Sequence, residues 1–186
     1  MKKKISKLSK KITSVKQQLN DVKKRFYKNK PVLAGQGKYK QGIYKPNFPD
    51  KYKGRLDNLV FRSGLELKWF KFFDLSPNIL QWKCEEVIVN YISPLDNCKH
   101  KYFIDVFILY KTNKGVLKKA LIEIKPLDQT KPPEQPKRMT KGYAYAVKQY
   151  ILNEAKWNAA SKIAEVNNIE FKILTEQGFV SWNPTY

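Results

Sequence analysis

Two apolar stretches in the middle of the chain carry ionisable residues of a kind that could do chemistry. Asp105 lies in KYFIDVFILYK, and Glu123 lies in VLKKALIEIKP with Lys125 two positions further on. Both stretches are typical of strands, so Glu123 and Lys125 share one face while Ile122 and Ile124 point to the other. Carboxylates supply the oxygen ligands that Mg²⁺ prefers, and an ammonium beside them can stabilise developing negative charge.

The register of the predicted hairpin decides whether the two acids meet. The stretches are joined through Asn113-Lys114-Gly115, which suits a three-residue hairpin loop with Gly115 in the positive-φ position. If Thr112 faces Val116, then Asp105 lies opposite Glu123. A bulge or a four-residue loop would shift this pairing by one residue.

Two facing carboxylates in apolar surroundings need compensation. Their like-charge contact costs a few tenths to about 1 kcal/mol, and desolvation among the neighbouring apolar side chains adds to it. A divalent cation, the Lys125 ammonium or protonation of one acid could compensate. On a very basic protein, such a set indicates metal-assisted hydrolysis of a phosphodiester. The residues alone also allow an exposed strand face for Asp105 and a solvated Glu123–Lys125 pair.

The charge of the chain indicates a polyanionic partner. Among 186 residues, 37 Lys and Arg oppose 16 Asp and Glu, a formal net charge of +21. Residues 1–58 hold 18 basic and 3 acidic residues, whereas residues 59–186 hold 19 and 13. Nucleic acid is the simplest partner for this excess; a well-solvated basic surface is the alternative. No stretch approaches the ~20 apolar residues of a membrane-spanning helix.

The cysteines predict neither a disulfide framework nor a zinc site. Cys84 and Cys98 form no CxxC pair, and even with His100 they fall short of a zinc ligand set. This usage suits a reducing, cytoplasmic setting.

Three regions are predicted along the chain. Residues 1–30 form a basic amphipathic helix with a heptad seam of Ile5, Leu8, Ile12, Val15, Leu19, Val22 and Phe26. That helix could form a short coiled coil, dock on its own domain, bind DNA or hold a partner protein. Residues 31–58, rich in Gly, Pro, Tyr and Lys, form an arm that could stack on bases or lie over the domain surface. Residues 59–186 form the globular domain.

The domain alternates helices and strands. Residues 61–76 predict a helix with Ser63 as N-cap and an apolar side of Leu65, Trp69, Phe72 and Phe73. Residues 85–93 and the two central stretches predict three strands, residues 143–166 a long helix and residues 169–176 a last strand. The order helix–three strands–helix–strand predicts an α/β (α+β) fold with one mixed sheet flanked by helices.

The ionisable residues of the two central stretches resemble the signature of a known family. Asp105, Glu123 and Lys125 match the D…(D/E)-x-K signature of the PD-(D/E)XK nuclease superfamily, whose restriction-endonuclease-like core has the same order of elements. The stretches GKYKQGIYKPNFPDKYKG, FRSGLELKWFKFFD, NILQWKCEEVIVNYISPLDNCKHKYFIDVFI, IEIKP, YILNEAKWNAA and FKILTE are similar to head completion nucleases of T-even-type contractile-tailed phages. Ile104 replaces the proline of the signature. The endonuclease subunit of certain transposons has a similar pattern.

The resemblance implies roles for individual residues. Asp105 and Glu123 would be metal ligands, with Glu66 reaching the metal from the first helix, and Lys125 would orient or activate the attacking water. Glu66 could instead form a capping box with Ser63. The cofactor would be Mg²⁺, with Mn²⁺ able to substitute. Further residues are expected to contact DNA: Arg62, His100, Lys101, Gln149, Asn153 and Lys156. A buried structural role is an equal alternative for Asn153.

The resemblance also implies a setting. The chain would be a metal-dependent deoxyribonuclease that acts on double-stranded DNA at or after packaging into a phage head. It would work in the host cytoplasm during assembly or in association with the virion, with head, portal or neck proteins bound through the leader helix. The alternatives are a non-catalytic DNA-binding head or neck protein and a transposon-type end-cutting endonuclease of the same fold.

Overall fold

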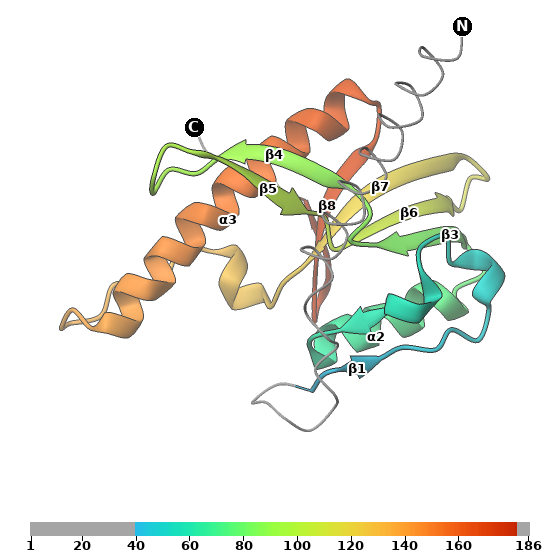
Figure 1. Cartoon of the computed structure of the whole chain (residues 1–186), viewed down its shortest axis with the longest axis horizontal. Helices are drawn as coiled ribbons and strands as arrows, with labels where there is room; N and C mark the ends of the chain where they lie inside the picture. Colours follow the sequence, from blue (N-terminus) through green and yellow to red (C-terminus); the bar gives the residue numbers. More distant parts are fainter. Residues whose placement is uncertain (1–39, 182–186) are drawn as a thin grey trace, which may run out of the picture.

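The computed structural model describes residues 40–181, so the predicted leader helix of residues 1–30 lies outside the described residues. At its centre is a five-stranded sheet in the order β3-β6-β7-β8-β9 (Figure 1). The strands are β3 Ile79–Cys84, β6 Val106–Lys111, β7 Leu117–Ile124, β8 Glu170–Thr175 and β9 Gly178–Ser181. Only the β7–β8 pairing is parallel, and a parallel pair needs a long crossover, which here contains helix α3, Lys141–Val166.

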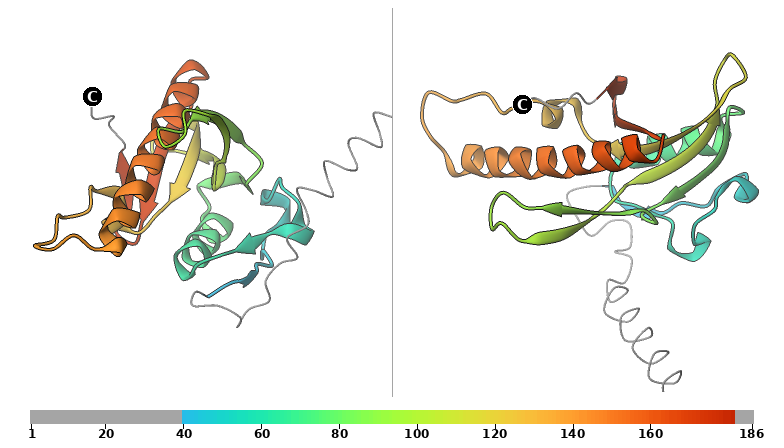
Figure 2. Two further views of the ribbon diagram at one scale, coloured as in Figure 1. Left: turned by 60° about the vertical axis from the view of Figure 1, so that its left-hand side comes forward. Right: turned by 90° about the horizontal axis from the view of Figure 1, so that it is seen from above.

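A helix covers each face of this sheet, as the three views in Figures 1 and 2 show. Helix α2, Gly64–Leu75, packs on one face with Ala120, Ile122 and Ile124 of β7. Helix α3 covers the other face, where Leu121 of β7 packs with Trp157. The alternation along β7 therefore assigns successive residues to two separate cores, and the predicted mixed sheet flanked by helices is confirmed.

Two small sheets and three short 3-10 helices complete the described fold. Strands β1 Gly42–Ile43 and β2 Val60–Phe61 pair beside α2, and β4 Ile88–Ile92 pairs with β5 Lys99–Phe103 over α3. The 3-10 helices are η1 Pro49–Lys51, η2 Leu56–Asn58 and η3 Leu127–Thr130. Within residues 40–181, no helix has the length and apolar character needed to cross a membrane.

The strand predictions need several corrections. Strands β1, β2 and β9 were not predicted, and β9 follows the stretch expected to be the last strand. KYFIDVFILYK is two strands, because the chain bends at Ile104-Asp105 and passes from the β4–β5 ribbon into the main sheet. Strand β3, the edge partner of β6, was not predicted at all, and residues 85–93 supply β4 of the ribbon instead. Backbone hydrogen bonds fix the bend, from Glu85 N–H to Asp105 O at 3.2 Å and from Ile104 N–H to Val87 O at 2.9 Å.

The helix predictions hold with one exception. Ser63 is the N-cap of α2, with its Oγ accepting from Glu66 N–H at 3.0 Å. Phe72, predicted on the apolar side, is 44% exposed, whereas Phe70 is buried. The long helix begins two residues before the predicted start and ends at the predicted Val166.

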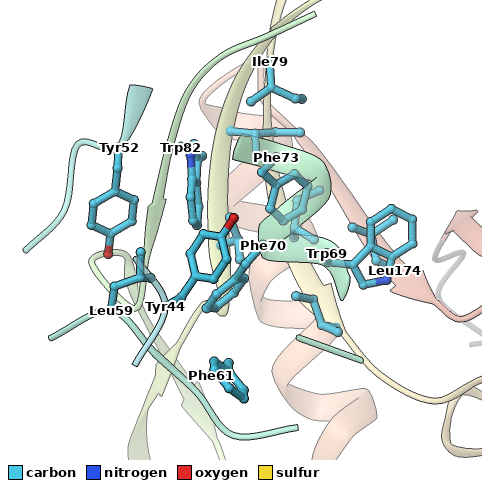
Figure 3. Close-up of a cluster of buried hydrophobic side chains, with 14 of the residues drawn as sticks. Tyr44, Tyr52, Leu59, Phe61, Trp69, Phe70, Phe73, Ile79, Trp82 and Leu174 are labelled. Atoms are coloured by element: carbon cyan, nitrogen blue, oxygen red, sulfur yellow. The ribbon is translucent and has the colours of Figure 1, made fainter. Parts of the chain in front are cut away.

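The core on the α2 face is aromatic and includes part of the predicted arm (Figure 3). The ring of Trp82 lies 4.7 Å from that of Tyr52 and 5.5 Å from that of Phe70, measured between centroids. Tyr44 and Tyr52 are both buried, so these two tyrosines of the arm cannot stack on bases. Residues 40–58, the described part of the arm, contribute to this core.

A buried carboxylate ties the same segment to α2. Asp74 accepts hydrogen bonds from Tyr44 Oη at 2.9 Å, Asn47 N–H at 2.7 Å, Asn47 Nδ2 at 2.9 Å and Phe48 N–H at 2.9 Å. Burial acts to raise the pKa of Asp74, but the hydrogen bonds from Asn47 and Phe48 outweigh it and hold the pKa below 3.8. The attachment of residues 44–48 to α2 therefore depends on the charged Asp74 carboxylate.

Asp74→Asn should lower the free energy of unfolding by about 1–3 kcal/mol at neutral pH, because an amide cannot accept from all of these donors. The folded-state pKa of Asp74 is depressed, so its contribution is present above the unfolded pKa and disappears as pH falls through the folded pKa. Urea denaturation at neutral and acidic pH measures both effects. Asp50→Asn, the same change at an exposed site nearby, should shift stability by less than about 0.5 kcal/mol; equal losses in both variants would contradict this account.

Candidate active site

The β6–β7 hairpin has the predicted register. Its pairs run from Lys111↔Leu117 to Val106↔Ile122, Thr112 N–H donates to Val116 O at 2.9 Å, and Gly115 adopts φ +80°. Asp105 follows the bend and immediately precedes the first paired residue of β6. The register therefore brings Asp105 beside the end of β7, where its Oδ2 accepts from Ile124 N–H at 2.7 Å.

Glu123 is a buried charge held by two partners. Its side chain is 3% exposed, and its Oε1 lies 2.9 Å from Lys125 Nζ. The hydroxyl of Tyr102 donates to Oε2. The chain thus places an acid in the interior of the sheet and surrounds it with a cation and a hydroxyl donor, a costly arrangement unless each partner is present.

The electrostatics of this group are strongly coupled. Burial raises the pKa of Asp105 well above its usual value and the Glu123 carboxylate adds to this, while Lys125 and the Ile124 N–H oppose it. Burial alone would lower the pKa of Lys125, but Glu123 and Asp105 outweigh it and raise the pKa. The predicted triad of Asp105, Glu123 and Lys125 is therefore one interacting unit in the fold.

A pocket of about 330 Å³ opens beside this unit. It lies where α2, β2, β3 and the ends of β6 and β7 converge. Its lining comprises Val60, Arg62, Glu66, Phe70, Cys84, Glu85, Asp105, Ile124 and Lys125.

Glu66 lies in the pocket and also caps its own helix. Its Oε1 accepts from Ser63 Oγ at 3.1 Å, and its Oε2 accepts from Arg62 N–H at 2.8 Å. The capping box with Ser63 is present in a modified form, because Glu66 accepts from the Arg62 N–H rather than from the Ser63 N–H. Both oxygens of Glu66 thus have donors in this conformation, while the residue still faces the pocket that Asp105 lines.

The carboxylates at the pocket are few for a metal site, but they are the type of ligand that Mg²⁺ takes. Within residues 40–181, no group of three or more His, Cys, Asp or Glu side chains is disposed to hold a metal ion. Mg²⁺ needs less than that, because proteins often hold it through one or two carboxylates with water and substrate phosphate completing the shell. Asp105, whose pKa is raised by burial and then by Glu123, lies beside the pocket and has the chemistry of such a ligand.

The residues expected to contact DNA are dispersed. Arg62 lines the pocket, where its guanidinium pairs with both oxygens of Glu85. His100 and Lys101 are exposed on β5, and His100 Nε2 lies 2.8 Å from Asp96 Oδ2.

The three candidates on α3 differ from one another. Gln149 is exposed. Asn153 is 8% exposed and lies among the buried residues of the helix, as the alternative of a buried structural role requires. The Nζ of Lys156 lies 5.8 Å from the ring of Tyr102 and 5.9 Å from that of Tyr91.

Two residues of the site were not predicted. Tyr102 comes from β5, and its partner Glu123 lies far away in sequence, so no local pattern marks the contact. Glu85 falls in the strand predicted over residues 85–93, but it lies at the bend with φ +53° and lines the pocket. A positive φ at a residue that is not glycine or asparagine has no signal in a single sequence.

Comparisons with known proteins identify the family of this chain. Residues 76–176, which include Asp105, Glu123 and Lys125, match the family model described as TnsA-like endonuclease N terminal. The head completion nuclease of Enterobacteria phage T4 is 33% identical over 141 residues, which are 74% of this chain and 91% of that protein. No solved structure matches. The chain therefore belongs to the TnsA-like endonuclease family of PD-(D/E)XK-type nucleases, with a restriction-endonuclease-like fold.

Proposed function

We propose that this chain is a metal-dependent deoxyribonuclease that hydrolyses phosphodiester bonds of double-stranded DNA. The observation that carries the proposal is the buried Asp105–Glu123–Lys125 unit beside an open pocket, in a chain that belongs to a nuclease family. The net charge of +21 supports DNA as the substrate.

Asp105 and Glu123 would hold Mg²⁺ or Mn²⁺, and Glu66 could join them if it released a capping donor. When bound, such a cation acts as a Lewis acid and lowers the pKa of its water. Lys125 supplies a fixed positive charge where negative charge grows on the phosphate. Its ion pair with Glu123 keeps the ammonium in place before DNA arrives.

The setting of the reaction follows the relative's name. We propose that the chain acts as a head completion nuclease on DNA at or after packaging, in the host cytoplasm or in the virion. The similarity covers 91% of that phage protein, which favours this setting over a transposon. Head, portal or neck proteins are proposed as partners of residues 1–30.

Nuclease assays on linear and circular DNA test the proposal. Cutting should require Mg²⁺ or Mn²⁺ and stop in chelator. Asp105→Asn should abolish it, and Lys125→Met should slow it by about 10²–10³-fold, the range for losing one electrostatic stabiliser. Asp50→Asn and Lys114→Met, the same substitutions at exposed sites, should cut at the wild-type rate.

Thermal melts of every variant must accompany these assays, because Lys125→Met leaves Glu123 buried without its cation. Folded Asp105→Asn protein that still cuts would sink the proposal, as would cutting in chelator. Tight DNA binding without cutting under either metal would favour the non-catalytic head or neck protein.

Tyr102 is a positioning residue in this scheme, because its hydroxyl orients the Glu123 carboxylate. Tyr102→Phe should lower the free energy of unfolding by about 1–3 kcal/mol, since a buried acceptor loses its donor. It should also raise the Mn²⁺ concentration needed for half-maximal cutting, while the rate at saturating Mn²⁺ changes less.

Tyr91→Phe is the matched control for Tyr102→Phe. Tyr91 is also buried in the ribbon, and within residues 40–181 its hydroxyl makes no hydrogen bond to a carboxylate. Equal metal dependence in both variants would show that the Tyr102 hydroxyl does not position Glu123.

A further inference from the structure

Helix α3 is only half covered by the rest of the domain. It has 26 residues, and its buried residues are Asn153, Trp157, Ala160 and Ala164. Residues 141–152 thus contain no buried side chain, and this end of the helix extends past the sheet in Figure 1. The loop that leads to it starts at Pro126, directly after Lys125 (Figure 2, right).

The exposed end carries an uncompensated positive charge. We call residues 131–148 the basic lobe. Over this range five basic residues oppose a single acid, Glu134. All five are exposed, and within residues 40–181 none of them forms an ion pair. They are Lys131, Lys137, Arg138, Lys141 and Lys148.

Some other cations of the described surface are paired with acids, unlike those of the lobe. Lys118 and Lys172 both pair with Glu170, and Arg62 pairs with Glu85. The lobe therefore concentrates positive charge without ion pairs at the far end of the loop that follows Lys125.

The lobe also has a geometry that suits a nucleic-acid backbone. Lys141, Tyr145 and Lys148 follow at spacings of four and three, which places them in one stripe on the helix, and Tyr145 is 65% exposed. Residues 141–152 extend about 18 Å, the length of about five base pairs of duplex DNA.

We infer that the basic lobe binds the sugar–phosphate backbone of duplex DNA beside the bond to be cut. The inference rests on the proposed function for the identity of the polyanion. Lysine and arginine would neutralise phosphates, and Tyr145 would contact phosphate or sugar. The loop that carries the first part of the lobe begins directly after Lys125, so one connecting segment joins the pocket to the lobe.

DNA binding in chelator tests the inference without catalysis. The triple variant Lys137→Ala, Arg138→Ala, Lys141→Ala is compared with Lys111→Ala, Lys114→Ala, Lys162→Ala, both in an Asp105→Asn background. The control residues are also exposed lysines, at the turn end of the β6–β7 hairpin and the far end of α3, so both triples remove three charges. Fluorescence anisotropy with a labelled duplex gives the affinity across a range of salt concentrations.

The lobe triple should bind DNA about tenfold or more weakly, and the slope of log K against log salt should become shallower by about 0.9 for each phosphate that the lobe no longer neutralises. The affinity of the control triple should fall clearly less. Melting temperatures of both should match the parent, because the substituted side chains are exposed.

Equal falls in affinity in the two triples would overturn the inference, since the lobe would then act only through net charge. An unchanged affinity of the lobe triple would overturn it too and direct attention to an acidic protein partner. A different result would reject the proposed function alone. Wild-type protein would cut no DNA with Mg²⁺ or Mn²⁺, while the lobe triple would still bind DNA more weakly than its control.

Discussion

The constraint on which the structure depends is the burial of the Asp105–Glu123–Lys125 unit. An isolated charge in a protein interior is too costly to persist, so each member requires the others. Lys125 stays ammonium because two carboxylates raise its pKa, and Glu123 keeps its place through Lys125 and Tyr102. The remaining repulsion falls on Asp105, whose pKa is raised by burial and by Glu123. That residue borders the pocket, where a cation or a proton can enter.

The rest of the domain supports this unit from both faces of the sheet. On one face, the aromatic core around Trp82 holds β3 and α2, and with them the pocket residues Cys84 and Glu66. On the other face, the β4–β5 ribbon delivers Tyr102 to Glu123 and packs on α3. The bend before β6 joins the two, because one backbone passes from the ribbon into the sheet at Asp105. A single change of direction thus provides a metal-ligand candidate and a supporting hydroxyl within four residues.

Local patterns in the sequence predicted the part of the site that the β6–β7 hairpin forms. The loop around Gly115 sets the hairpin register, so Asp105 and Glu123 could be brought together from spacing alone. The bend at Asp105 could not be predicted, because Ile104 and Val106 read as a continuous strand and the break results from hydrogen bonds to distant residues. Strand β3 was missed for a similar reason. Its core residue Trp82 is identified only by partners such as Tyr52, from a segment that reads as an arm.

The distribution of charge explains how such a site can serve a polyanion. The pocket itself is not basic, since Glu66, Glu85 and Asp105 oppose Arg62 and Lys125 there, with Glu123 buried behind them. Phosphate would meet repulsion at this point unless a cation were present. The excess of 37 basic over 16 acidic residues must therefore act from elsewhere. Screening limits each charge to about 8–10 Å in physiological salt, so attraction has to come from basic segments near the pocket but outside it. In the proposed function, long-range attraction is thus separate from the acidic centre, and hydrolysis would be confined to the pocket that Asp105 borders.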